Sequence, residues 1–480
     1  MGYIAAILGR EGQDVSNLLK RMLRGMGGPR PSLFGVASPE SGEFFDRSLD
    51  SMPNMGSSII AYKSSSPTTS PQQPILQRSG ALVFDGSTYS AVEPDILHVA
   101  ELLKDGVAEG TRKLVSDGGG AFSAAAIENA GVFLARDAVG TVPVYYGGDD
   151  RVLAAASNIK SLMAIGMEPS PVIPGTVMGL SKRGYETHEV RKIRNPKQTR
   201  LSMKQCIETL DDLLAEVSED IVMKTRRGAV AFSGGIDSTL AAHYLKGAGG
   251  DIELICVGVG DQQEYREARK SAEALNLELN IHPFTKDELK ESLDKIILSV
   301  EDPHPMKIGV AAPLYFTVRQ AVEDGHTNVF SGNGSDELFG GYHSYMTQWL
   351  KEGEKVADTM YRDVVESWKN NYERDAKICK DLCVRLVLPF ADHRIIEFGL
   401  GVPVEYKLPS SIEEPRKTIL RKLAKKLGFP AEISDRPKKA IQYSTGVHRA
   451  LISLAKSRGE RLPEFLKRRH EELFSNRLQG

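Results

Sequence analysis

Cysteine is scarce in this sequence: its 480 residues include only Cys206, Cys256, Cys379 and Cys383. So few thiols exclude a disulfide scaffold and are typical of a reducing compartment. Cys379 and Cys383 have a spacing that could suit a metal pair, but no second pair of cysteines or histidines accompanies them nearby. We therefore expect these two residues to be partly buried thiols rather than metal ligands.

The sequence also lacks a dominant charge and long apolar runs. The 61 Lys and Arg residues nearly balance the 63 Asp and Glu residues, so no overall basic field favours a nucleic acid or an anionic membrane. Nowhere do about 18 apolar residues run uninterrupted, and the apolar run after Met1 is shorter than a signal-peptide core. We expect a soluble, cytoplasmic protein with no membrane partner and no nucleic-acid partner.

The first 180 or so residues contain many short β-like runs. Turn residues separate these runs, a pattern that favours layered antiparallel sheets. The runs are Tyr3–Leu8, Ser58–Tyr62, Ala81–Phe84, Gly120–Ile127, Val132–Ala135, Val142–Tyr146 and Val152–Ala155. From about Ser181 to Thr199 the chain is polar and charged, which predicts a connector between domains.

The pattern changes after residue 200. A long amphipathic segment over 206–223 precedes an apolar run at 229–232, and further strand-like runs at 253–260 and 278–284 alternate with helical patterns. Strands that alternate with helices predict a doubly wound parallel sheet. After about residue 345 the pattern is mostly helical.

The stretch "VAFSGGIDSTLAAHYL" places small and polar residues between a strand and a helix. Gly234 and Gly235 let the backbone approach phosphate oxygens closely, and the hydroxyls of Ser233 and Ser238 can donate to those oxygens. The carboxylate of Asp237 would repel phosphate unless a divalent cation lay between them. The turn therefore predicts a site for a magnesium nucleotide.

This turn matches neither the Walker pattern nor GxGxxG. SGGxDS directly after a strand resembles the signature of the pyrophosphate-loop ATPases. The resemblance implies cleavage of ATP between its α- and β-phosphates and adenylation of a substrate.

A second stretch, "NVFSGNGSDELFGGYHSY", resembles the second nucleotide loop of asparagine synthetases. Together with "EDPH", "LVLPFADHRIIEF", "RKTILRKLA" and "SDRPKKA", it stands in the order of that family, so the resemblance covers roughly residues 205–450. Nearer the N-terminus, "FDGSTYS", "VFLARDAVGTVPVYYGG" and "LAAASNIKSLMAIG" resemble segments of the family's glutaminase domain.

The whole chain thus resembles the asparagine synthetase B family, to which the β-lactam synthetases are related. The resemblance implies an αββα sandwich of the N-terminal-nucleophile hydrolase type over residues 1–185, an ATP-dependent synthetase domain over 200–460 and a helical tail over 461–480.

The resemblance also implies site residues, with ATP and Mg²⁺ as cofactors. Asp237 and Asp336 resemble the magnesium-binding pair, and Lys438, next to Lys439, matches a lysine near the adenylate. Lys417 and Arg421 resemble cations beside the pyrophosphate. The remaining implied ATP contacts are Phe232, Ser233, Gly234, Gly235, Ser238, Gly258, Ser331 and Gly332.

The N-terminal segment departs from the family pattern at two positions. Gly2 stands where the family exposes its cysteine nucleophile, and a glycine has no side chain to attack a carboxamide. Asp85 replaces an asparagine, and its carboxylate would repel the negative charge that develops in an oxyanion site. We expect no glutamine hydrolysis, so this domain would be a relic, a regulatory module or a platform for a separate ammonia-donating protein.

The synthetase segment departs at one position. Asn333 stands where the family has a catalytic glutamate, and an amide can form hydrogen bonds but cannot ionise. β-Lactam synthetases also differ at this position and lack the terminal cysteine, so an amide ligase acting on a different acid stays open.

The leading hypothesis is an AMP-forming ligase that adenylates a carboxylic acid, aspartate by default, and joins it to ammonia or an amine. Two hypotheses from other classes stay open: a nucleotide-binding regulator without catalysis, and an RNA-modifying pyrophosphate-loop enzyme, which the near-neutral charge and the lack of CxxC disfavour. A homodimer also stays open.

Overall fold

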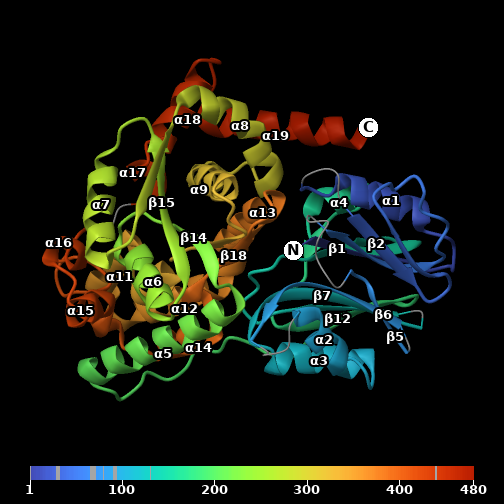
Figure 1. Cartoon of the computed structure of the whole chain (residues 1–480), viewed down its shortest axis with the longest axis horizontal. Coiled ribbons are helices and arrows are strands. Elements are labelled where there is room, and N and C mark those ends of the chain that lie inside the picture. The colour runs from blue at the N-terminus through green and yellow to red at the C-terminus, as the bar shows by residue number, and fades with distance from the viewer. Residues whose placement is uncertain are drawn as a thin grey trace. The chain divides into compact units, whose positions relative to one another are not determined.

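The computed structural model describes residues 2–28, 33–64, 72–78, 80–89, 94–129, 131–437 and 440–479. They form two compact units (Figure 1). The first comprises residues 1–192, 380–383 and 471–480, and the second comprises residues 193–379 and 384–470. None of the helices within the described ranges is long and apolar enough to cross a membrane.

The first unit contains two sheets in which every strand pair is antiparallel. The seven-stranded sheet has the order β11-β9-β10-β1-β4-β2-β3. Its strands are β1 (Gly2–Gly9), β2 (Leu33–Ser38), β3 (Gly42–Asp46), β4 (Ser58–Ser64), β9 (Tyr145–Gly148), β10 (Val152–Ala156) and β11 (Ser170–Pro171). The six-stranded sheet has the order β13-β12-β8-β7-β6-β5. Its strands are β5 (Ile75–Gln77), β6 (Gly80–Thr88), β7 (Gly120–Glu128), β8 (Gly131–Arg136), β12 (Thr176–Ser181) and β13 (Gly184–Glu189).

The two sheets of this unit pack face to face, and helices cover their outer faces (Figure 1). Helices α1 (Ser16–Gly25) and α4 (Ile159–Met163) lie on the seven-stranded sheet, while α2 (Asp95–Leu102) and α3 (Val107–Asp117) lie on the six-stranded sheet. The alternation of side chains along β1 explains the layers, because Ile4, Ala6 and Leu8 belong to the core between the sheets while Tyr3, Ala5 and Ile7 face the helices. The predicted αββα sandwich is confirmed.

Two details of the N-terminal prediction are wrong. Strand β13 lies within the segment predicted as a connector, and it pairs with β12 from Thr176 opposite Glu189 to Ser181 opposite Gly184. The strand was not evident in the sequence because β13 is an edge strand whose side chains are mostly exposed and polar, so it shows no apolar alternation. Strand β9 begins at Tyr145 rather than at Val142.

The second unit contains a five-stranded parallel sheet in the order β16-β15-β14-β17-β18. The first strand in sequence, β14, is central; β15 and β16 follow on one side, and β17 and β18 lie on the other. The strands are β14 (Arg227–Ala231), β15 (Asp251–Val259), β16 (Leu279–Phe284), β17 (Asn328–Phe330) and β18 (Arg385–Val387). The predicted doubly wound sheet is confirmed, and its strand order reverses between β14 and β17, the place where such sheets bind ligands.

Helices surround this sheet, and some begin at caps that the sequence encodes. Ser202 with Gln205, and Thr285 with Glu288, form capping boxes at α5 and α8. The helices are α5 (Met203–Lys224), α6 (Ile236–Gly247), α7 (Gln263–Leu275), α8 (Lys286–Val300), α9 (Pro305–Glu323), α10 (Ser335–Phe339), α11 (His343–Glu352), α12 (Val356–Ser367), α13 (Glu373–Asp381), α14 (His393–Gly401), α15 (Thr418–Lys426), α16 (Ala431–Ser434), α17 (Ile441–Ser444), α18 (Val447–Lys456) and α19 (Leu462–Gln479).

Substitutions in the core between the two N-terminal sheets should lower the free energy of unfolding more than substitutions at exposed positions. Leu134 of β8 is fully buried in this core, so Leu134→Ala should lower the free energy of unfolding by about 2–5 kcal/mol. Leu97 of α2 is 43% exposed, so Leu97→Ala should change it by less than about 0.5 kcal/mol. Hydrogen exchange of the β7 and β8 amides measures both effects within this unit, and equal protection in the two variants would contradict the assigned core.

Candidate active site

The two glycine-containing turns lie at the ends of neighbouring strands. Strand β14 pairs in parallel with β17, with Val230 opposite Phe330. Parallel strands end at the same edge of a sheet, so residues 232–235 and residues 331–334 leave the sheet side by side. The structure therefore brings together two segments that lie about a hundred residues apart in the sequence.

The first turn has a shape that requires glycine at its centre. Gly234 has φ +65°, and a Cβ there would lie 2.7 Å from Cα of Ala268. Gly235 caps helix α6, and the hydroxyls of Ser233 and Ser238 lie 3.4 Å apart beside that helix end. The backbone N–H groups at the start of a helix form an anion-binding position.

Two side chains donate hydrogen bonds to the backbone of this turn. Arg436 donates to the carbonyl oxygen of Gly234 at 3.1 Å and forms an ion pair with Glu264 at 3.1 Å. The Ser271 hydroxyl donates to the same carbonyl at 2.9 Å. These bonds fix the orientation of the peptide group that follows Gly234. The motif "SDRPKKA" contains Arg436, but its spacing alone gave no sign of this role.

The second turn touches the first turn of helix α6, and the acidic residues that follow the two glycine-containing turns meet at one lysine. A Cβ on Gly332 would lie 2.8 Å from Cβ of Asp237, so only glycine permits this approach. The Lys417 ammonium contacts the carboxylate of Asp237 and lies 2.7 Å from that of Asp336. It also donates to the Ser335 hydroxyl at 2.9 Å. Asp237 and Asp336, predicted from separate motifs, thus lie within reach of one cation.

Lys417 occupies an unusual position in the backbone. Its side chain is fully buried, and its φ of +67° at the start of α15 is rare for a residue with a side chain. Such a conformation costs about 1–3 kcal/mol and persists only where the surroundings enforce it. The three contacts of its ammonium group are the surroundings that do so here.

The acidic pair suits a magnesium ion that is held partly by phosphate. The side chains of Asp237 and Asp336 are 14% and 22% exposed, so both still face solvent. Across the described ranges, no group of three or more His, Cys, Asp or Glu side chains is arranged to hold a metal by itself. Mg²⁺ is commonly bound by one or two carboxylates together with substrate phosphates, and the donors present here fit that mode.

Asn333 is committed to a hydrogen bond with a carboxylate. Its amide nitrogen donates to Asp375 at 2.7 Å, and the other carboxylate oxygen of Asp375 accepts from Arg374 at 2.7 Å. A glutamate at position 333 would direct a negative charge at Asp375. Sequence reasoning missed Asp375, since it lies 42 residues beyond Asn333 and outside every motif.

Glu337 lies in α10, the helix that follows the second turn. Glu337 is fully buried; its burial, and then the neighbouring Asp336, raise its pKa. Tyr342 and Asn371 donate hydrogen bonds to the same oxygen of Glu337. The carboxyl group of Glu337 therefore favours its neutral form more than an ordinary glutamate does.

The other predicted residues are distributed around the turns. The backbone N–H of Phe232 donates to Ile255 at 2.9 Å, and that of Ser331 donates to Val387 at 3.1 Å, so both turns continue the ladder of the sheet. Gly258 is buried near the end of β15, where a Cβ would lie 2.8 Å from the Tyr265 hydroxyl oxygen. Lys438 and Lys439 lie outside the described residues.

Arg421, predicted as a cation beside the pyrophosphate, makes hydrogen bonds to backbone carbonyl groups. Its guanidinium donates to the carbonyl oxygens of Arg416 and Ser434, the latter at 2.6 Å. Its burial lowers its pKa, although Asp237 acts in the opposite sense. Its bonds link the segment before α15 to the last residue of α16.

The cysteines take no part in the site. Cys206, Cys256, Cys379 and Cys383 are all free thiols, and only Cys383 is not buried. Burial raises the pKa of the Cys256 thiol to about 12 and raises that of Cys379 well above its ordinary value.

The first unit contains Gly2 and Asp85, the two residues that differ from the family pattern. A Cβ on Gly2 would lie 2.4 Å from the carbonyl oxygen of Lys63 and 2.5 Å from the Tyr62 ring, so this position has no room for a side chain. Asp85 accepts from the backbone N–H of Gly2 at 3.2 Å and forms an ion pair with Lys380 at 2.5 Å. Burial alone would raise the pKa of Asp85, but the Lys380 charge helps to hold it below its ordinary value.

Family comparison agrees with this geometry. Residues 209–381 and 348–477 match the family model described as asparagine synthase, and together these ranges cover more than half of the chain. The chain belongs to the asparagine synthase family. This membership implies a synthetase, a ligase of the ATP-dependent kind. Residues 65–164 also match a model described as a glutamine amidotransferase domain.

Relatives in the asparagine synthase family are similar over most of this chain. The putative asparagine synthetase 1 (glutamine-hydrolyzing) of Methanocaldococcus jannaschii is 29% identical over 389 residues, which cover 70% of this chain and 71% of that protein. The asparagine synthetase (glutamine-hydrolyzing) of Mesocricetus auratus is 27% identical over 363 residues, which cover 69% of this chain and 64% of that protein. Among solved structures, a glutamine phosphoribosylpyrophosphate amidotransferase from B. subtilis matches with a TM-score of 0.36 and 12% identity, covering 58% of this chain and 81% of that one.

The bridging role of Lys417 predicts a large effect of its removal. Lys417→Met removes the buried ammonium that contacts both carboxylates, and we expect the free energy of unfolding to fall by about 3 kcal/mol. Lys426→Met removes a solvated ion pair with Asp211 from the same helix and should leave stability almost unchanged. Urea denaturation of both variants measures the difference, and equal midpoints would show that the bridge contributes nothing.

Proposed function

We propose that this chain is a ligase that uses ATP to join a carboxylic acid, aspartate by default, to a nitrogen nucleophile, with AMP and pyrophosphate as products. The observation that supports this most is the meeting of Asp237, Asp336 and Lys417 where the two turns touch. Two acids and one buried cation at adjacent strand ends suit a nucleotide that is attacked at its α-phosphate.

In the first step, an oxygen of the substrate carboxylate attacks the α-phosphorus of ATP. The bond to the bridging oxygen of the β-phosphate breaks, which gives an acyl-adenylate and pyrophosphate. The N–H groups at the start of α6 and the Ser233 and Ser238 hydroxyls would hold phosphate oxygens. The Lys417 ammonium, already buried between the two turns, would offset charge on the departing pyrophosphate.

A magnesium ion, when bound, would neutralise phosphate charge and keep the pyrophosphate in line for departure. Asp237 and Asp336 would hold it, and Lys417 would then pair with phosphate oxygens as well as with these carboxylates. Lys438, by its place in the motif, would stabilise charge on the adenylate.

In the second step, a nitrogen attacks the activated acyl carbon, AMP leaves, and the nitrogen loses a proton. The local structure of the first unit supports a nitrogen source other than its own glutamine hydrolysis. Gly2 has no room for a nucleophilic side chain, and Asp85 places a carboxylate where a hydrogen-bond donor to an oxyanion would be needed. Free ammonia, an amine or a separate donor protein would then supply the nitrogen.

One observation favours a second candidate, an amide ligase that acts on another acid, as β-lactam synthetases do. Asn333 and Asp375 form one hydrogen-bonded pair beside the second turn. The amide does not ionise at neutral pH and so cannot act as a general acid or base, and this pair would therefore select and orient an acceptor differently from a glutamate.

Exchange of labelled pyrophosphate into ATP tests the first step. We expect exchange that depends on Mg²⁺ and on a carboxylic acid, with aspartate compared against a panel of other acids. Asp237→Asn and Asp336→Asn should each slow it by roughly a hundredfold or more, because even partners of metal ligands are worth about 10- to 100-fold. Asp294→Asn, which removes a partly exposed ion pair with Arg469, should exchange at the normal rate. No exchange with any acid would favour a regulator that only binds nucleotide.

Ammonia release from glutamine tests the first unit. We expect none above background, and we expect Gly2→Cys to restore none, because the added side chain would collide with Lys63 and Tyr62 and destabilise β1. In Gly131→Cys the added Cβ would lie 3.7 Å from the carbonyl oxygen of Glu128, an ordinary contact, so this control should leave stability intact. Glutamine turnover by the unaltered protein would refute this part of the proposal.

A further inference from the structure

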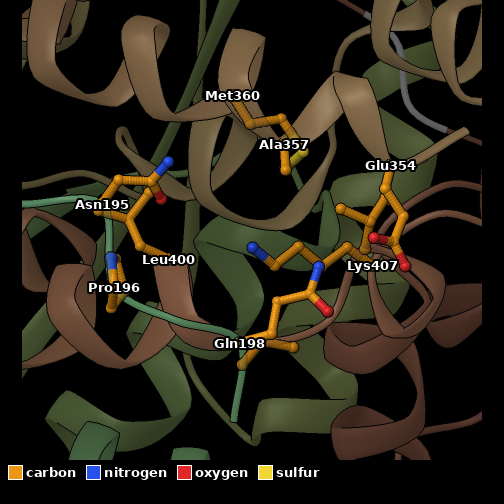
Figure 2. Close-up of a pocket in the computed structure, with 10 residues that line it drawn as sticks. Asn195, Pro196, Gln198, Glu354, Ala357, Met360, Leu400 and Lys407 are labelled. Carbon is orange, nitrogen blue, oxygen red and sulfur yellow. The ribbon is translucent and has the colours of Figure 1, made fainter. Parts of the chain in front are cut away.

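The second unit contains a cavity of about 190 Å³ whose lining residues belong to neither nucleotide turn. Its apolar wall consists of Met360 from α12, Leu400 from α14, and Val402 and Val404 from the segment that follows α14. The side chain of Lys407 extends into the space between these walls (Figure 2).

Polar groups lie around the opening of this cavity. Asn195 and Gln198 come from the segment before α5, and Glu354 comes from the short helix Gly353–Lys355 (Figure 2). All three residues are exposed, whereas Lys407 is only 3% exposed. The cavity thus combines a solvated polar rim with an apolar interior that contains a single ionisable group, the amine of Lys407.

Among the described residues, no carboxylate lies within ion-pair distance of Lys407 Nζ and no acceptor lies within hydrogen-bond distance of it. Burial alone lowers the pKa of Lys407 to about 7. An unpaired buried ammonium is costly, and a well-placed anion would relieve that cost.

The walls of the cavity are fixed by hydrogen bonds. The N–H of Thr199 donates to Gly401 at 2.8 Å, and the Tyr361 hydroxyl donates to Ile193 at 3.0 Å, so the segment that carries Asn195 and Gln198 is held against α12 and α14. The N–H of Lys407 donates to Val404 at 2.9 Å. The cavity is therefore formed before any ligand arrives.

We propose that this cavity binds a small aliphatic carboxylate whose anionic group pairs with Lys407. A cavity of 150 Å³ holds benzene, so about 190 Å³ suits roughly six to eight non-hydrogen atoms. The carboxylate lies against Nζ, and the hydrocarbon part lies against Met360, Leu400 and Val402.

The charges of the site favour one carboxylate over a phosphate or a dicarboxylate. The single cation of the lining matches one negative charge, and Glu354 at the rim repels a second one. A phosphate dianion needs several donors, whereas the inner walls are aliphatic. The site is independent of the proposed ligase function, because it contains no residue of either nucleotide turn.

Calorimetric titration of the full chain with isovalerate, without ATP or magnesium, tests the proposal. We expect a Kd at or below about 1 mM for isovalerate and binding at least tenfold weaker for isovaleramide, which has the same shape without the charge. Lys407→Met should bind neither compound measurably. Lys355→Met, which removes an exposed lysine next to Glu354, should bind isovalerate normally.

A second variant tests the cavity in case Lys407→Met fails to fold. Ala357→Leu fills part of the cavity from a partly exposed position of α12 while leaving Lys407 in place, and it should weaken isovalerate binding at least tenfold. Equal binding of isovalerate and isovaleramide, unchanged binding by Ala357→Leu, tighter binding of inorganic phosphate, or no binding of isovalerate would each overturn the proposal.

Discussion

The candidate active site depends on two carboxylates from separate turns that approach one another closely. Two like charges at this distance need a cation between them, and the buried ammonium of Lys417 supplies it. The strand order brings the turns together, because β14 and β17 are neighbours at the point where the order of the strands reverses. Gly332 then permits contact with Asp237 that any larger residue would block. The charge of Lys417, the order of the strands and the lack of a side chain at Gly332 therefore together bring the two carboxylates into one site.

The residues that depart from the family pattern are matched by their surroundings. Asn333 donates to Asp375, Asp85 pairs with Lys380, and the space beside Gly2 is filled by Tyr62. Asn333 and Asp85 therefore each have a partner, and at Gly2 the ring of Tyr62 occupies the space that a side chain would need. Reverting one member alone would therefore create a repulsion or a collision, so each departure has to be understood together with its partner.

The sequence predicted many of the strands and the two acidic residues of the candidate site. It did not predict the other strands or two of the site contacts, and physical reasons explain why. Periodicity revealed both sheets of the first unit and the parallel sheet, because strands such as β1 and β14 are apolar where they are buried. It missed six strands of this unit, namely β2, β3, β5, β11, β12 and β13. The edge position of β13 leaves its side chains polar. The turns of the site follow from local motifs, so Asp237 and Asp336 could be named as candidates from the sequence, and the structure brings both into contact with Lys417. Asp375 and Arg436 were not, since their contacts join residues 42 and more than 200 positions apart.

Two buried lysines on one short segment show how differently a protein can accommodate the same charge. Lys417 is surrounded by two carboxylates and a hydroxyl, whereas Lys407 faces an apolar cavity, where burial lowers its pKa to about 7. The N–H of Thr418, next to Lys417, donates to the carbonyl of Lys407 at 2.9 Å. A buried amine without a partner destabilises the fold unless it is neutral or a ligand pairs with it. The fold thus pairs the ammonium of Lys417 with two carboxylates but leaves the amine of Lys407 facing a cavity, an arrangement that suits the anion site proposed there.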